Sequence, residues 1–345
     1  MRRTSTIVTA VAAIAAAASL MLTGCVAGEG QAAADPAKST GTTGGTLNID
    51  FATYNPLSLV IKKEGWLEKA LKKQDITVNW VQSAGSNKAN EALRSNAIDV
   101  GSTAGSAALL ARSNGSAIKT IDIFSQPEWS AIVVGQNSAI TSVKDLKGKQ
   151  VAATKGTDPY FFLLQSLEAN GLSASDVTIQ NLQHADGWAA LQNGSVDAWA
   201  GLDPIMANAE KSGAKLIYRN VGFNTYGFLN ATESFLKNKP DVAQTVVNTY
   251  EYARAWALKH PDETASILSD VASIDPAVAT TVITERTNLD VSNIPGDAQL
   301  KVLKKVGPIF VTTGDVRSQS DIDKALDTLL DPTFAKKADP SAIGG

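Results

Sequence analysis

A short stretch near the middle of the chain has the residue types and spacing of an anion-binding turn. Residues 150–154 (QVAAT) are mostly apolar and bounded by turns, which predicts a buried strand. A Lys-Gly-Thr turn follows at residues 155–157, and Pro159 suits the first turn of a helix that stops at Gly171. This order directs free backbone N–H groups and the positive end of a helix dipole at one point, where an anion can bind. A single glycine is also what an ordinary turn requires, so the motif alone leaves both readings open.

The residues that most catalytic or metal sites would need are scarce. Cys25 is the only cysteine, so no internal disulfide can form. His184 and His260 lie far apart in the sequence and near no cysteine, so we expect neither a zinc site nor a Cys/His dyad. The sequence also contains no G-x-S-x-G motif and no Walker loop. We therefore predict no enzymatic activity, no metal and no cofactor.

The first residues have the pattern of an export signal. Two arginines at positions 2 and 3 precede an apolar run over residues 7–22, which is short for a membrane span of ~20 residues. The run ends in the sequence LTGC, which resembles the bacterial lipobox. We therefore expect residues 1–24 to be a signal peptide and Cys25 to carry lipid. Such a protein is extracytoplasmic and held by its anchor at the outer face of the cytoplasmic membrane or in the periplasm.

The remaining chain divides into a tether, a body and a tail. Residues 25–45 are small, polar and glycine-rich, which predicts a flexible tether. The body runs from residue 46 to about residue 335, a length typical of two lobes, and residues 336–345 form a C-terminal tail. The two arginines are the only charged residues in the signal, so 29 basic and 34 acidic side chains remain. No basic patch of the kind that binds nucleic acid is present, and we expect a monomer.

Strand and helix patterns alternate along the body. Alternating strands at residues 46–51 and 76–81 and a shorter one at residues 97–101 are separated by helical patterns, among them residues 57–72. This rhythm predicts a mostly parallel sheet with helices on both faces. Ligands of such sheets bind at the carboxyl ends of the strands.

A second unit with the same rhythm interrupts the first. It spans residues 130–228, so that residues 46–129 and 229–335 form lobe 1 and the inserted unit is lobe 2. The chain then crosses between the lobes near residues 126–134 and 226–231. We predict an α/β fold of two lobes, each a mostly parallel sheet flanked by helices, with a cleft that closes by hinge motion.

Several spaced segments resemble the periplasmic binding proteins of the aliphatic sulfonate, taurine and nitrate type. They are ALRSNAIDVGST at residues 92–103, VKDLKGKQVA at residues 143–152, the turn at residues 155–157, and VDAW at residues 196–199 with Asp203 and its proline. The resemblance covers the body and implies the solute-binding component of an ABC importer, which docks on a membrane permease. It implies an anionic or zwitterionic solute, with an aliphatic sulfonate as first choice.

The resemblance also implies which residues hold the anionic group. Family members use the loop after the third strand and the Lys-Gly-Thr turn, which here are Ser102 and Thr103 together with Gly156 and Thr157. The sequence departs from the family at Asp158, where a small polar residue is usual. Asp158 reads either as a helix N-cap or as a partner for an amine or ring N–H of the ligand.

Further candidate ligand residues follow from their places in the predicted sheets. They lie at strand ends or in the loops around the cleft, and they are Tyr54, Asn55, Gly85, Glu128, Trp129, Asp186, Asp203 and Tyr226. Trp199 alternates with Val196 and Ala198 on a predicted strand, so we expect it in the core. For Arg286 we expect a surface salt bridge in preference to a contact with the anion.

Other functions share parts of this pattern. An aromatic or pyrimidine-like vitamin precursor would use Trp129, Tyr226, Glu128 and Asp158 on the same fold. A pyrimidine synthase on this scaffold carries a cysteine-rich iron motif, which one cysteine cannot supply. A surface adhesin or a sensor partner is a third class, and neighbouring genes for a permease and an ATPase would argue against it.

Overall fold

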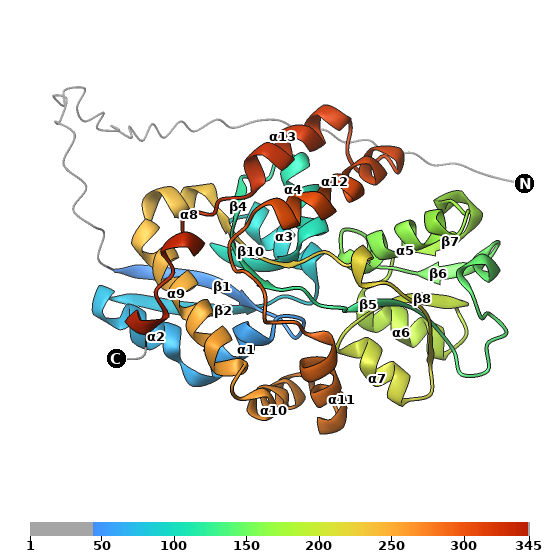
Figure 1. Ribbon diagram of the computed structural model, residues 1–345, viewed down its shortest axis with the longest axis horizontal. Helices are drawn as coiled ribbons and strands as arrows, with labels where there is room; N and C mark the ends of the chain where they lie inside the picture. The colour runs from blue at the N-terminus through green and yellow to red at the C-terminus, as the bar shows by residue number, and fades with distance from the viewer. Residues whose placement is uncertain (1–43, 344–345) are drawn as a thin grey trace, which may run out of the picture. The chain divides into compact units, whose positions relative to one another are not determined.

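The protein contains two sheets that are built from separate strands. The computed structural model describes residues 44–343, so the predicted signal peptide, Cys25 and nearly all of the tether lie outside the described residues. The strands of the first sheet are β1 (Gly45–Phe51), β2 (Ile76–Gln82), β3 (Val100–Ala104), β4 (Ile118–Ser125) and β10 (Gly227–Thr232). The strands of the second are β5 (Ser130–Val134), β6 (Gln150–Ala152), β7 (Thr178–Gln180), β8 (Ala198–Leu202) and β9 (Lys215–Arg219). Their orders are β2-β1-β3-β10-β4 and β7-β6-β8-β5-β9 (Figure 1).

Both sheets are mixed, but four of the five strands in each run in the same direction, which agrees with the prediction of mostly parallel sheets. In the first sheet β1 pairs in parallel with β2 and β3, but β10 runs antiparallel to both β3 and β4. In the second sheet β6 pairs in parallel with β7 and β8, whereas β5 runs antiparallel to β8 and β9. The reversed strands are the two that enter directly from the other lobe without a crossover helix, and such a helix is what parallel neighbours need. The α/β class with two lobes is confirmed.

Helices cover both faces of each sheet (Figure 1). On the first sheet, α1 (Pro56–Glu64), α2 (Trp66–Leu71) and α9 (Pro240–Ala257) cover one face, and α3 (Ser86–Arg94) and α4 (Gly105–Ser113) cover the other. Helices α12 (Asp297–Thr312) and α13 (Gln319–Leu329) pack over α4. On the second sheet, α5 (Asp158–Ala169) covers one face, and α6 (His184–Gln192) and α7 (Ile205–Lys211) cover the other. The remaining helices are α8 (Glu233–Asn238), α10 (Pro261–Ala272) and α11 (Pro276–Thr281).

Local sequence explains where α1 begins and ends. The side chain of Asn55 accepts a hydrogen bond from the backbone N–H of Ser58, and Pro56 occupies the first turn, where its missing N–H costs nothing. Gly65 adopts the left-handed conformation at φ 65° and its N–H bonds the carbonyl of Ile61, which closes α1. The single helix predicted over residues 57–72 is therefore two helices that are separated at this glycine.

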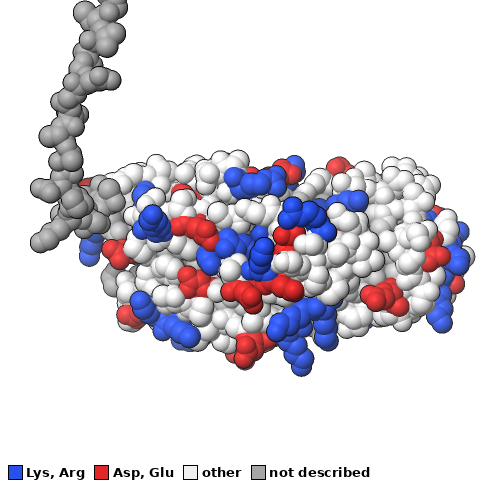
Figure 2. Space-filling model, turned by 90° about the horizontal axis from the view of Figure 1, so that it is seen from above, with Lys and Arg blue, Asp and Glu red and all other residues white. Residues whose placement is uncertain are grey.

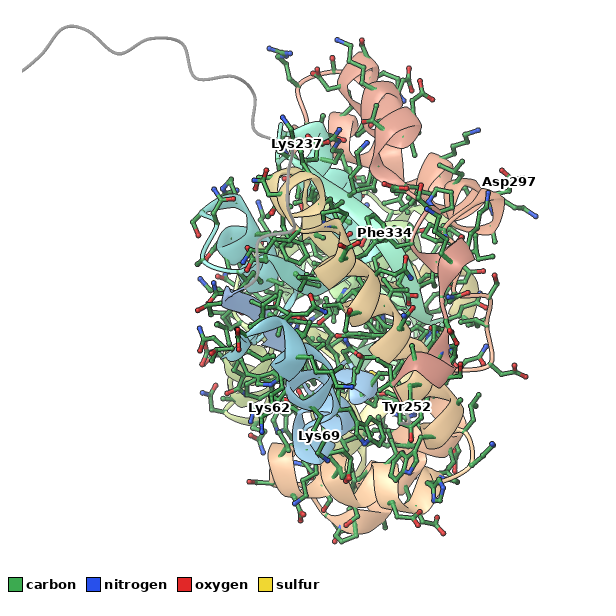
Figure 3. All side chains as sticks on the ribbon, turned by 90° about the vertical axis from the view of Figure 1, so that its left-hand side faces the viewer. Lys62, Lys69, Lys237, Tyr252, Asp297 and Phe334 are labelled. Atoms are coloured by element: carbon green, nitrogen blue, oxygen red, sulfur yellow. The ribbon has the colours of Figure 1, made fainter. Side chains whose placement is uncertain are left out.

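The outer face of α1, α2 and α9 carries aromatic and basic side chains (Figure 3). The rings of Trp66 and Tyr252 meet edge to face with their centroids 4.8 Å apart, which joins α2 to α9. The ammonium group of Lys62 lies 4.8 Å from the centre of the Phe51 ring at the end of β1. Its aliphatic stem thus covers apolar surface while its charge stays at the surface.

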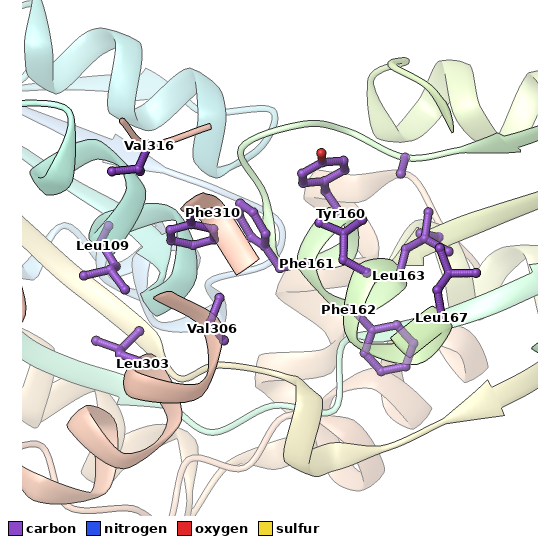
Figure 4. Close-up of a cluster of buried hydrophobic side chains, with 14 of the residues drawn as sticks. Leu109, Tyr160, Phe161, Phe162, Leu163, Leu167, Leu303, Val306, Phe310 and Val316 are labelled. Carbon is purple, nitrogen blue, oxygen red and sulfur yellow. The ribbon is translucent and has the colours of Figure 1, made fainter. Parts of the chain in front are cut away.

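One hydrophobic cluster continues from the first lobe into the second. In Figure 4, Phe161 of α5 lies against Phe310 of α12, with ring centroids 4.3 Å apart, and Leu109 and Val306 lie beyond Phe310. Because α5 belongs to the second lobe and α12 to the first, this apolar contact joins the lobes. Trp199 is fully buried within the second lobe, as predicted.

The surface shows charges of both signs. On the face seen in Figure 2, basic and acidic side chains are interspersed and neither sign dominates a broad area. Among residues 44–343, there is no helix whose length and apolar character would let it cross a bilayer.

Candidate functional site

The predicted turn lies at the N-terminus of α5. Gly156 has φ 77°, in the left-handed region that glycine adopts at little cost. The hydroxyl of Thr157 donates to the carbonyl of Thr154 at 2.6 Å, which closes the turn. Within residues 44–343, the backbone N–H groups of Gly156, Thr157 and Asp158 have no hydrogen-bond acceptor. Free donors and the positive end of the dipole of a twelve-residue helix are features that favour an anion, so the anion site at this turn stays a prediction.

Residues of the other lobe face this turn. A Cβ atom placed on Gly156 would lie 3.6 Å from the Cβ of Asn87, near the start of α3. A Cβ placed on Gly85, just before α3, would lie 2.8 Å from Asn87 Oδ1 and 3.0 Å from His184 Nε2. The N-termini of α3, α5 and α6 therefore meet between the lobes. We call Gly85, Asn87, Gly156, Thr157 and His184 the polar cradle.

His184 is a site residue that the sequence analysis missed. Its side chain is buried, and within residues 44–343 neither its Nε2 nor Asn87 Oδ1 has a hydrogen-bond partner. Burial lowers the pKa of His184 to about 4, so the ring is neutral near pH 7. The sequence pattern excludes a zinc site and a Cys/His dyad, but it does not test a histidine as a hydrogen-bonding residue. The position of His184 in the sequence could have indicated this role, because the residue begins a helix shortly after a strand. The Lys-Gly-Thr turn has the same position between a strand and a helix.

The buried carboxylate of Asp158 forms hydrogen bonds that connect the two lobes. Its carboxylate accepts hydrogen bonds from the hydroxyl of Ser106 at 2.5 Å and from Trp129 Nε1 at 2.8 Å. It also accepts from both the N–H and the hydroxyl of Thr225, each at 2.7 Å. Asp158 belongs to α5, Ser106 to α4, and Trp129 and Thr225 to the two chain crossings. Burial raises the pKa of Asp158, and these hydrogen bonds oppose the rise.

The structure corrects the N-cap reading of Asp158. Thr157 is the N-cap residue of α5, and Asp158 is the first residue of the helix. Its carboxylate reaches across to α4 and the crossings instead of turning back to its own helix. Since four donors already use its two oxygens, little acceptor capacity is left for an amine of a ligand.

Ser102 and Thr103 direct their hydroxyl groups into the first lobe. Ser102 donates from both its N–H and its hydroxyl to Asp50, at 2.8 and 2.9 Å. The hydroxyl of Thr103 accepts from the side chain of Asn230 and donates to the carbonyl of Ala104. Burial raises the pKa of Asp50 to about 7, although hydrogen bonds from Ser102 and Ser83 lower it. These two hydroxyl groups therefore serve an internal network.

Tyr54, Asn55 and Trp129 also make internal contacts. The hydroxyl of Tyr54 donates to the carbonyl of Ser102 at 2.9 Å, and its ring meets Trp129 edge to face. Asn55 caps α1 and donates to the hydroxyl of Tyr250. Tyr54 and Trp129 share a cavity with Asp203, but its volume of about 10 Å³ suits at most one water molecule.

The other predicted residues lie apart from the polar cradle or at its edge. Glu128 forms an ion pair with Arg219 at 2.7 Å. Asp186 is exposed on α6, and Tyr226 is half-buried and packs against the cluster that joins the lobes. Of the residues predicted from the sequence, the structure thus brings together Gly85, Gly156 and Thr157.

Asp203 and Arg286 form a buried pair, which corrects the expected surface salt bridge. Arg286 is 5% exposed and donates from Nη1 to Asp203 at 3.2 Å and from Nη2 to Glu210. Burial raises the pKa of Asp203 to about 7, and the guanidinium opposes the rise. Because residues 282–286 follow α11 and Asp203 follows β8, this pair also links the two lobes.

A larger hollow lies near the chain crossings and away from the polar cradle. It has a volume of about 700 Å³, and its lining includes Glu128, Val221, Leu258, Arg286 and Asp290. Its size would admit a small molecule. Within residues 44–343, no group of His, Cys, Asp and Glu side chains is placed to hold a metal ion.

The chain matches known proteins over most of its length. The sequence pattern of the family described as NMT1/THI5 like matches residues 58–264. A protein of Bacillus subtilis (strain 168), whose name describes a binding protein for aliphatic sulfonates, is 32% identical over 293 residues. The match covers 83% of this chain and 85% of that protein.

Solved structures have the same fold. The alkanesulfonate-binding protein SsuA from Xanthomonas axonopodis pv. citri, solved with bound MOPS, has a TM-score of 0.73 and 26% identity, covering 85% of this chain and 99% of that chain. The periplasmic aliphatic sulphonate binding protein SsuA from Escherichia coli has a TM-score of 0.70 and 26% identity, covering 84% of this chain and 92% of that one.

Proposed function

Because the chain belongs to the NMT1/THI5-like family, we propose that it is the extracytoplasmic solute-binding component of an ABC importer and binds an aliphatic sulfonate between its lobes. The names of its relatives in Bacillus subtilis, Xanthomonas axonopodis and Escherichia coli support the solute class. The protein acts as a monomer and delivers the solute to a permease in the membrane.

The observation that carries this proposal is the convergence of three helix N-termini on the polar cradle. A sulfonate group has one negative charge spread over three oxygens, so it needs several hydrogen-bond donors from different directions. The N–H groups at Gly156 and Thr157 point from the second lobe, and the start of α3 approaches from the first. Helix N-termini stabilise anions without a fixed cation.

The large hollow is a poorer site for such a ligand. Its lining includes Glu128, Glu285 and Asp290, which repel an anion, and Arg286, which is already paired with Asp203 and Glu210. The residues proposed to bind a vitamin precursor are already engaged with other groups of the protein. Glu128 is paired with Arg219, and Asp158 and Trp129 bond one another inside the protein.

We also propose that the protein has no catalytic activity. Among residues 44–343, buried carboxyl groups that could serve as acids or bases lie in internal networks, as Asp50, Asp158 and Asp203 do. No hydroxyl in the polar cradle has a base that would activate it, since the hydroxyl of Thr157 donates to a backbone carbonyl. A binding protein releases its solute unchanged.

Gly85→Ala is the variant that tests the cradle. The added methyl group would lie 2.8 Å from Asn87 Oδ1 and 3.0 Å from His184 Nε2, so these two polar side chains would have to move out of their places in the cradle. We expect the affinity for propane-1-sulfonate to fall at least about tenfold, which corresponds to ~1.4 kcal/mol. Calorimetric titration of the purified protein measures this loss.

Gly135→Ala is the matched control, because a Cβ at that position meets no atom within 4 Å. The control should bind as the unaltered protein does. A panel of propane-1-sulfonate, sulfate, nitrate and a pyrimidine extends the test by thermal shift, since a ligand that binds only the folded state raises its melting temperature. Stabilisation by the pyrimidine alone would refute the sulfonate assignment.

The membrane anchor is a separate proposal that concerns residues outside the described part. The LTGC sequence supports lipidation of Cys25 after removal of residues 1–24. We expect Cys25→Ser to leave the chain unprocessed or to release it into the medium, as cell fractionation and mass measurement would show. A variant that still appears as a processed membrane protein would contradict the anchor.

A further inference from the structure

The imidazole of His184 faces the polar cradle with an unused nitrogen. The side chain is 2% exposed, and its Nε2 lies 3.0 Å from the point where a Cβ on Gly85 would sit. Asn87 Oδ1 lies 2.8 Å from the same point. Two buried polar atoms of opposite lobes thus face the same small space, and within residues 44–343 neither has a partner.

The hydrogen bonds of the Thr154 hydroxyl determine which nitrogen of the His184 ring carries the proton. Thr154 Oγ1 donates its only hydrogen to the carbonyl of Leu182 at 2.7 Å. The contact between Thr154 Oγ1 and His184 Nδ1, at 3.2 Å, therefore requires Nδ1 to be the donor. Nε2 is left with a lone pair, so it and Asn87 Oδ1 are both acceptors. A proton on Nε2 would supply the donor that this side of the cradle lacks.

The described elements around His184 do not raise the pKa of its ring through a negative charge. The charged side chains on the adjoining turn, on α3, on α6 and on α7 are Lys155, Lys88, Glu91, Arg94, Asp186, Glu210 and Lys211. Four of these are already paired, Lys88 with Glu91, Glu210 with Arg286, and Lys211 with Asp275. Burial alone accounts for the lowered pKa of His184. An anion placed beside Nε2 would oppose that effect by favouring the charged ring.

We propose that binding of an anionic group in the polar cradle draws one proton from solvent onto Nε2 of His184, which then donates a hydrogen bond to that group. The ligand class is therefore an anion that is ionised at every working pH and accepts hydrogen bonds, as a sulfonate does. This inference rests on the proposed function, since it adds a proton to the binding of the same solute. His184 supplies the cradle with a positive charge only when the ligand is present.

The test is calorimetric titration of the full protein with propane-1-sulfonate between about pH 5 and pH 8. The probe stays ionised throughout, so it contributes no titration of its own. With the unaltered protein, we expect the affinity to rise as the pH falls, by up to about tenfold per pH unit when one proton is taken up. Buffers with different ionisation enthalpies should give different apparent binding heats, and the difference reports the number of protons.

His184→Gln is the decisive variant, because glutamine offers a neutral N–H donor that does not titrate. It should still bind propane-1-sulfonate, with little pH dependence in the same window. Asp50 and Asp203 remain in both proteins, so a contribution from their titration cancels in the comparison. Equal pH dependence in the two proteins would overturn the inference while leaving sulfonate binding intact. Failure of the folded, unaltered protein to bind the probe at any pH would overturn the proposed function, and the inference with it.

Nuclear magnetic resonance of the imidazole rings provides a second measurement that does not depend on altering His184. The chain has two histidines, and His260 is half-buried and stacked on Trp256, so His260→Gln leaves one imidazole to observe. In that variant, saturation with propane-1-sulfonate at about pH 6 should convert the His184 signals from a neutral to a doubly protonated ring. Signals that stay those of the neutral tautomer would show that Asn87 or another group donates instead, and would refute the proton uptake.

Discussion

Replacing Asp158 by alanine is expected to destabilise the protein by about 3 kcal/mol, because two fixed donors lose their acceptor. The indole N–H of Trp129 and the backbone N–H of Thr225 are buried and cannot turn elsewhere. The hydroxyl groups of Ser106 and Thr225 can rotate, so they add less. Equilibrium unfolding in urea, followed by tryptophan fluorescence, gives the free energy of unfolding.

Asp186→Ala is the matched control, because Asp186 is an exposed aspartate near the start of another helix of the same lobe. It should change the free energy of unfolding by less than about 0.5 kcal/mol. If Asp158→Ala costs no more than this control, the four hydrogen bonds do not stabilise the protein as the geometry implies.

Asp158→Asn separates the role of the carboxylate in joining the lobes from a role in ligand contact. Asparagine retains one acceptor oxygen, so the loss of stability should be smaller than for alanine. Because the carboxylate lies inside the protein, the variant should shift the affinities for propane-1-sulfonate and for the amine-bearing taurine by the same factor. A loss confined to taurine would restore the interpretation of Asp158 as a partner for an amine.

Arg254→Met should have the largest effect on stability, with a loss of about 3–5 kcal/mol. Arg254 of α9 is 6% exposed, and Nη1 donates to the carbonyls of Phe124 at 3.0 Å and Leu289 at 2.7 Å. Its Nη2 donates to the carbonyl of Ile123, and Nε donates to Glu251 at 3.0 Å. Methionine fills similar volume but leaves these acceptors, the partly buried carboxyl group of Glu251 and the fully buried one of Asp122 without a cation.

Arg317→Met provides the comparison at a surface site. Arg317 pairs with Asp321 in α13, but its side chain is 86% exposed. Water solvates both ions whether or not they pair, so the loss should stay below about 1 kcal/mol. If the two arginine variants lost similar amounts of unfolding free energy, burial would not explain the stabilisation expected from Arg254. The free energies of unfolding in urea again measure both.

Much of the fold follows from patterns that are local in the sequence. The alternation at residues 46–51 and 76–81 predicted β1 and β2, and the helix that follows the Lys-Gly-Thr turn became α5. The family resemblance and the two-lobe α/β class are also confirmed. The division of the lobes at residues 130 and 228 stays a prediction. These successes have a common cause, because hydrophobic period and turn residues act within a few residues of one another.

The direction of strands in the sheets did not follow from such patterns. Periodicity indicates that β5 and β10 are strands, but it contains no information on which neighbours they pair with. Their antiparallel insertion depends on where the chain enters each lobe. The same limit applies to Arg254, whose acceptors at Ile123 and Phe124 precede it by about 130 residues.

The amino-acid sequence determined the Lys-Gly-Thr turn at the start of α5, because a strand, a glycine and a helix start in succession fix the direction of N–H groups within one short segment. Only the tertiary structure decided what faces that turn. The donors to Asp158 lie 29 to 67 residues away in the chain, and His184 meets Gly85 across two lobes. Such contacts depend on how the lobes pack, and hydrogen bonds between distant residues leave no periodic trace in a sequence. Asp158, for which the sequence offers a helix cap or a contact with a ligand amine, instead joins the lobes. His184, for which the sequence predicts neither a zinc site nor a dyad, faces the cradle.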